Sequence, residues 1–157
     1  MAVRIFIHGL ESSNQGTKAI FFRKNYPDMI IPNFKGDLHE RMERLNEILS
    51  GKSGIRLVGS SFGGLMACLF ALQNEGSVER MILLAPAINL KEFVHDEVRK
   101  ISIPVWVYHG TRDLVIPLRE VEGVARKTFR NLSFHVVEDD HYLHKTFEKI
   151  DWERLLS

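Results

Sequence analysis

Short runs of β-branched and aromatic residues alternate along the chain with longer stretches whose apolar residues recur every three or four positions. This alternation is typical of a parallel β-sheet that is covered by helices on both faces. The central runs are continuously apolar, as expected of strands that are buried on both sides. Six strands are predicted: Val3–His8, Met29–Pro32, Ile55–Gly59, Arg80–Ala85, Pro104–His109 and Leu132–Val137.

The stretches between these strands predict the covering helices. They are Thr17–Lys24, Leu38–Leu49, Gly64–Gln73, Leu118–Phe129 and Tyr142–Leu156, with a shorter one at Leu90–Lys100. No repeat, low-complexity tract or flexible linker interrupts the pattern. The sequence therefore predicts one α/β domain over residues 1–157, with a doubly wound, mostly parallel six-stranded sheet.

Composition narrows the range of partners. With 157 residues, of which 45% are hydrophobic and 26% charged, the chain fits a single globular domain and not a disordered or disulfide-dense protein. The formal net charge of +1 provides no field that favours nucleic acid or an anionic membrane. A single cysteine, no signal-peptide pattern and no apolar run of about 20 residues predict a cytoplasmic protein without membrane contact. A small-molecule substrate is the expected partner.

Polar or glycine-rich loops follow four of the predicted strands, at residues 8–14, 59–64, 109–113 and 138–141. In open sheets of this kind, ligands bind beyond the carboxyl ends of the strands. One of these loops contains the pattern G-x-S-x-G at residues 59–63, between an apolar strand and a helix. A turn that tight would expose the hydroxyl of Ser61 at the sheet edge, while Ser60 would point the other way. Ser61 is therefore the predicted nucleophile.

A serine hydroxyl needs a base to remove its proton and a carboxylate to orient that base. His141 follows the last strand, and Asp113 lies in the loop before it, which gives the chain order Ser, Asp, His. His144 is the alternative base. The neighbouring pair Asp139-Asp140 could act as a rival acid or raise the pKa of His141. His109 is expected to brace the loop that carries Asp113.

The chain resembles the α/β-hydrolases, the fold family of many esterases, lipases and thioesterases. The resemblance rests on His8-Gly9-Leu10, on the motif at 59–63, on His109-Gly110-Thr111-Arg112-Asp113 and on His141. More narrowly, H-G-L-E-S-S followed by G-S-S-F-G-G is similar to small, lidless bacterial proteins described as predicted esterases. The first two strands of the family sheet are missing.

The resemblance implies that Ser61 attacks a carbonyl carbon, that His141 transfers the proton and that Asp113 stabilises the imidazolium. It also implies that the backbone N–H groups of Leu10 and Phe62 bind the oxyanion. The expected activity is hydrolysis of a carboxylic ester or thioester of a small acyl group through an acyl-enzyme, without metal or organic cofactor. Because residues 86–103 are too few to form a lid, a shallow, open cleft is expected.

Two other functions compete with hydrolysis. A nucleotide-binding switch would need G-x-x-x-x-G-K-[ST], and neither Gly16-Thr17-Lys18 nor Gly51-Lys52-Ser53 completes that pattern. A hydrolase-like binding protein without catalysis remains the alternative, since a fold does not fix a function. The presence of Ser61, Asp113 and His141 argues against it.

Overall fold

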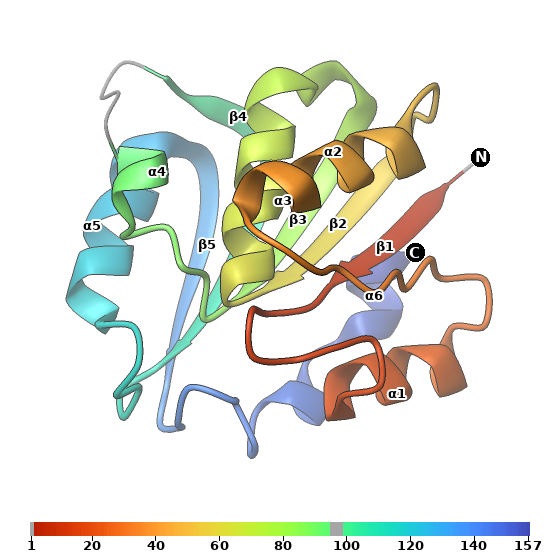
Figure 1. Cartoon of the computed structure of the whole chain (residues 1–157). Coiled ribbons are helices and arrows are strands. Elements are labelled where there is room, and N and C mark those ends of the chain that lie inside the picture. Colours follow the sequence, from red (N-terminus) through yellow and green to blue (C-terminus); the bar gives the residue numbers. More distant parts are fainter. Residues whose placement is uncertain (1, 95–98) are drawn as a thin grey trace.

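A five-stranded parallel sheet forms the centre of the fold, seen in a computed structural model that describes residues 2–94 and 99–157 (Figure 1). The strands lie side by side in chain order, and each neighbouring pair is parallel. They are β1 (Val3–Ile7), β2 (Ile55–Ser60), β3 (Val78–Leu84), β4 (Ile101–Gly110) and β5 (Phe129–Val137). All their carboxyl ends therefore meet at one edge, where the predicted functional loops converge.

Helices cover both faces of the sheet. Helices α1 (Thr17–Asn25) and α6 (Trp152–Leu156) lie against one face (Figure 1). On the other face lie α2 (Leu38–Leu49), α3 (Phe62–Gln73), α4 (Lys91–Val94) and α5 (Leu118–Thr128). This arrangement confirms the predicted doubly wound α/β class, and α2 has the bounds that its apolar period predicts.

The sheet separates two apolar cores, because successive side chains of a strand point to opposite faces. On β1, Ile5 and Ile7 pack into the core under α2, α3 and α5, whereas Phe6 packs into the core under α1 and α6. The first is called core A and the second core B below. Strands β2 and β3 contribute to both cores, which explains why their sequences read as continuous apolar runs.

The predicted strand Met29–Pro32 is not part of the sheet. Only Ile30 pairs, in an isolated parallel bridge to Ile5, with the amide of Ile30 donating to Arg4 and its carbonyl accepting from Phe6. Pro32 follows two residues later and has no N–H with which to continue a ladder. The sheet thus has five strands where six were expected.

The predicted helix Tyr142–Leu156 is broken. It contains only the 3₁₀ turn Phe147–Lys149 and the short α6. Leu143 has a φ of 56°, a left-handed conformation that interrupts a right-handed helix. The side chain of Asp151 then accepts from the amide of Arg154 and starts α6 afresh. Apolar spacing alone gave no sign of this break.

The segment after β3 contains the expected short helix in reduced form. Of the predicted Leu90–Lys100, only α4 is helical, residues 99–100 are not, and 95–98 lie outside the described residues. In the described part of the chain, no helix is both long and apolar enough to cross a membrane.

Candidate active site

The turn between β2 and α3 places Ser61 at the carboxyl edge of the sheet. Ser61 is the residue at this turn, and its backbone has φ 54° and ψ −117°, a conformation that residues other than glycine seldom adopt. Its amide donates to the carbonyl of Leu84 (2.9 Å), and its carbonyl accepts from the amide of Ala87 (2.9 Å). Hydrogen bonds to a neighbouring strand and loop therefore hold the strained backbone in place.

Two glycines make this turn possible because backbone segments cross there without room for side chains. A Cβ on Gly59 would lie 2.5 Å from the carbonyl oxygen of Gly63, and a Cβ on Gly63 would overlap the carbonyl of Ile7. Gly9 approaches from the first loop, where a Cβ would lie 3.3 Å from the Cβ of Ser61. The loop after β1 thus lies directly beside the serine.

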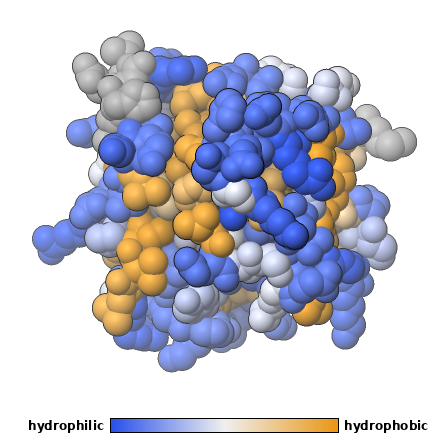
Figure 2. Space-filling model, viewed as in Figure 1, coloured by the Kyte–Doolittle hydropathy of each residue, from blue (hydrophilic) through white to orange (hydrophobic). Residues whose placement is uncertain are grey.

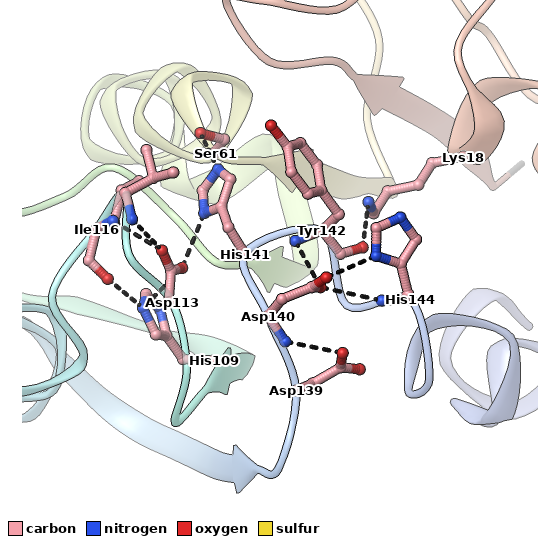
Figure 3. A network of polar contacts seen from close by, with 11 residues as sticks. Lys18, Ser61, His109, Asp113, Ile116, Asp139, Asp140, His141, Tyr142 and His144 are labelled. Atoms are coloured by element: carbon pink, nitrogen blue, oxygen red, sulfur yellow. Dashed lines mark hydrogen bonds and ion pairs between the residues drawn. The ribbon is translucent and has the colours of Figure 1, made fainter.

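Ser61, His141 and Asp113 lie in one hydrogen-bonded line (Figure 3). His141 Nε2 is 3.1 Å from Ser61 Oγ, and His141 Nδ1 is 2.8 Å from Asp113 Oδ2. Because the carboxylate can only accept, we assign the imidazole proton to Nδ1, which leaves the Nε2 lone pair facing the serine hydroxyl. This is the arrangement that a general base requires.

The side chain of Asp113 is fully buried and is held by its own loop. Its Oδ1 accepts from the amides of Val115 (2.9 Å) and Ile116 (2.8 Å), while Oδ2 faces His141. These hydrogen bonds compensate the buried charge and fix the direction of the carboxylate. His109 braces the loop as expected, since its Nε2 lies 2.8 Å from the Ile116 carbonyl and 3.2 Å from Asp113 Oδ2.

The two rival carboxylates hold the loop that carries His141. Asp139 accepts from the amides of Lys145 (2.9 Å) and Thr146 (2.8 Å). Asp140 accepts from the amide of Tyr142 and pairs with His144 Nδ1 at 2.6 Å. Among the described contacts of His141, none is to either carboxylate. They shape the turn and do not take the place of Asp113.

The same contacts set the charge state of Asp140. Desolvation by itself would raise its pKa, but the hydrogen bonds from His144 and Tyr142 outweigh it and hold the pKa at about 2. His144 is bonded to this carboxylate and lies mostly in solvent. No group of three or more His, Cys, Asp or Glu side chains that could hold a metal ion occurs in residues 2–94 and 99–157.

His8 fixes the loop that follows β1. It is buried, its Nδ1 lies 2.7 Å from the carbonyl of Gly9, and its Nε2 lies 2.9 Å from the amide of Phe34. Both contacts are satisfied by a neutral ring with the proton on Nδ1. Burial lowers the pKa of His8, which favours that neutral form.

This contact bears on Leu10, because the Gly9 carbonyl and the Leu10 N–H belong to one planar peptide group and point in opposite directions. The amide of Leu10 meets no acceptor in the described part of the chain. The amide of Phe62 begins α3, where helical amides have no partner within the helix. The sequence placed His8 near this loop but gave no sign that its ring orients the Gly9–Leu10 peptide.

A cavity of about 660 Å³ opens around Ser61 and His141. Its walls are formed by the loop after β1 with the start of α1, by the β3–α4 loop, by the β4–α5 loop and by residues 141–148. These connections stand above the sheet edge and enclose space that a lid would close in a larger protein.

A protein-family model matches most of the chain. The model of the dienelactone hydrolase family matches residues 11–139. The chain belongs to the dienelactone hydrolase family. It is accordingly a hydrolase of the α/β-hydrolase superfamily, as the four motifs imply. The matched stretch includes Ser61 and Asp113 and stops two residues before His141.

Solved structures give the same fold. A YdeN-like hydrolase from Pectobacterium atrosepticum matches with a TM-score of 0.75 and 19% identity, over 100% of this chain and 94% of that one. A hydrolase of the alpha/beta superfamily from Xanthomonas campestris matches with a TM-score of 0.75 and 22% identity, over 99% and 96%. Est1E from Butyrivibrio proteoclasticus, with ferulic acid bound, matches with a TM-score of 0.77 and 16% identity, over 99% and 86%. No curated protein matches by sequence.

Proposed function

We propose that this member of the dienelactone hydrolase family is a serine hydrolase that cleaves carboxylic esters or thioesters through an acyl-enzyme. The observation that carries the proposal is the bridging position of His141, 3.1 Å from Ser61 Oγ and 2.8 Å from Asp113 Oδ2. A hydrogen-bonded nucleophile, base and orienting carboxylate is the arrangement that activates a serine. The reaction needs no metal or organic cofactor, because these side chains supply nucleophile and proton transfer.

In the first half of the reaction, Ser61 Oγ attacks the carbonyl carbon while its proton passes to His141 Nε2. Negative charge develops on the carbonyl oxygen, where the amides of Leu10 and Phe62 donate to it; one such donor is typically worth about 3 kcal/mol. The bond to the leaving group then breaks, and His141 returns its proton to the departing oxygen or sulfur. The acyl group remains on Ser61.

In the second half, water attacks the acyl carbon and gives its proton to His141 Nε2. The tetrahedral intermediate collapses, the proton returns to Ser61 Oγ, and the carboxylic acid leaves. Asp113 keeps the Nδ1 proton in place and stabilises the imidazolium in both halves.

The alternative is a binding protein that keeps the fold but not the reaction. The strained turn at Ser61 argues against it, since strain of this kind costs on the order of 1–3 kcal/mol and gathers at active sites. The decisive experiment is trapping of the intermediate. Acid quenching during turnover of a p-nitrophenyl ester, and of a matched thioester, should give protein that carries one acyl group.

The matched controls are neighbouring serines. Ser61→Ala should show neither acylation nor turnover, while Ser60→Ala should still be acylated, because only the Ser61 hydroxyl contacts His141. A folded wild-type protein that neither hydrolyses the ester or the thioester nor becomes acylated would contradict the serine hydrolase and favour the binding protein.

A further inference from the structure

The lining of the cavity next to Ser61 includes residues of both cores, which lie on opposite faces of the sheet. On one side its lining includes Ala87 and Ile116, which belong to core A, and Leu90, which packs against that core. On the other side it includes four residues of core B, which are Phe6, Ala19, Leu143 and Phe147. Because the cores lie on opposite faces of the sheet and Ser61 stands at its edge, the serine lies between two apolar lobes.

The first lobe, lobe A, reaches the surface through an apolar rim. Val115 lines the cavity and is 61% exposed, and its neighbour Leu114 is 97% exposed. Hydrophobic side chains gather on the surface over the β4–α5 connection that carries them (Figure 2). Exposed apolar groups at the mouth of a cavity are typical of ligand-binding surfaces.

The second lobe, lobe B, has charged groups only at its rim. The Lys18 ammonium donates to the Tyr142 carbonyl (2.7 Å) and stands 5.5 Å from the centre of the Phe147 ring. The side chains of Glu11 and Glu148 are exposed. Lys18 thus ties α1 to the segment after His141 (Figure 3), while Phe6 and Ala19 in the lining are almost fully buried.

We propose that the substrate is an uncharged ester or thioester with an apolar group on each side of the reacting carbonyl, one in each lobe. This inference rests on the proposed function and names the substrate class of that site. The volume of about 660 Å³ lies in the range of about 300–1,000 Å³ that encloses a drug-sized ligand, and a short acyl group alone would leave much of it unfilled. Both halves of the substrate therefore contribute to recognition.

The test on the wild-type protein is a two-way panel of linear esters, in which the acyl chain is lengthened at a fixed alcohol and the alcohol at a fixed acyl group. Burial of each added methylene should raise kcat/KM by about fourfold until the lobe is full. The rise must appear along both series. A rate that falls from the shortest member onward in either series overturns the proposal.

Matched variants assign each series to a lobe. Ala19→Leu fills lobe B and Ala87→Leu fills lobe A, whereas Gly123→Leu adds the same side chain at an exposed position of α5 with open space around it. For each series, we compare kcat/KM for the longest ester with kcat/KM for the shortest one. We expect Ala19→Leu to lower this ratio at least tenfold in one series and Ala87→Leu to lower it at least tenfold in the other. Gly123→Leu should keep the wild-type ratios in both.

The outcomes separate this proposal from the proposed function. Suppose that wild type hydrolyses short esters. If neither Ala19→Leu nor Ala87→Leu changes the ratios, or if both change the ratio of the same series, the two-lobe inference is wrong while the serine hydrolase stands. If no ester is turned over and Ser61 is never acylated, the proposed function itself fails. Ala19→Val and Ala87→Val, which add less bulk, repeat the test should a leucine variant not fold.

Discussion

The turn that carries Ser61 and the loop that carries His141 are built on different principles. At Ser61 the backbone is confined by close packing, because neighbouring backbone atoms leave no room for a Cβ at Gly59 or at Gly63. At His141 the loop is held by polar contacts, in which Asp139 and Asp140 accept from backbone amides and from His144. Steric exclusion and two backbone hydrogen bonds hold the turn at Ser61, whereas hydrogen bonds to carboxylate side chains hold the loop at His141.

The largest difference in activity is expected between variants of His141 and His144, the two histidines of the loop after β5. His141→Ala should lower kcat by about 10⁶-fold, because loss of the base in a triad costs about as much as loss of the whole triad. His144→Ala should retain most of the activity, since its ring contacts Asp140 in solvent and not Ser61. Steady-state hydrolysis of one ester measures both. Equal losses would place His144 in the reaction.

The carboxylates provide the next largest difference. Asp113→Asn should lower kcat by about 10⁴-fold, because an amide favours the wrong tautomer of the imidazole. Asp140→Asn should have a much smaller effect, since this carboxylate shapes the turn and does not contact His141. The two variants are compared by kcat at one pH with folding checked by circular dichroism. The assignment of the acid would be reversed by the opposite ranking.

Stability tests the steric side of the comparison. Gly63→Ala should lower the free energy of unfolding by about 3 kcal/mol, because its Cβ would overlap the Ile7 carbonyl. In a protein of this size that lowers Tm by about 6–12 °C. Gly76→Ala, with nothing within 4 Å of the new Cβ, should leave Tm nearly unchanged. Thermal unfolding of both variants decides, and a tolerant Gly63 would contradict the steric account.

The smallest expected effect is on the pH dependence of stability. Burial lowers the pKa of His8 and of His109 below the ordinary value of 6.5. The unfolded chain therefore binds protons before the folded one, and the free energy of unfolding should fall as pH drops from about 6.5 towards 5. Urea unfolding at pH 7, 6 and 5 measures this. A constant stability over that window would mean that these rings are not held neutral.

The same contrast explains what sequence could predict. The turn at Ser61 is predictable from the sequence because the glycines of the G-x-S-x-G pattern and the apolar run of the preceding strand are both visible in it. The Tyr142–Leu156 helix was predicted wrongly because apolar spacing does not show the left-handed Leu143 or the amide contacts of Asp139. Hydrogen bonds from single polar side chains to nearby backbone amides determine the conformation of such loops. Apolar spacing does not show these hydrogen bonds.

The sixth strand was predicted wrongly for a related reason. Met29–Pro32 has strand-like composition, yet Pro32 cannot continue the ladder that Ile30 begins. The cavity depends on how four loops stand above the sheet edge, which length alone does not reveal. The order of Ser61, Asp113 and His141 was visible in the sequence because each follows a recognisable strand.

Covalent labelling is the closest test of the proposal that His141 activates Ser61. The native protein is treated with a fluorophosphonate, which phosphonylates an activated serine with loss of fluoride, and the product is examined by intact-mass and peptide mass spectrometry. We predict one adduct, located on Ser61, absent from Ser61→Ala and retained in Ser60→Ala. A folded wild-type protein that stays unlabelled, or one labelled at another residue, would mean that Ser61 is not the activated serine.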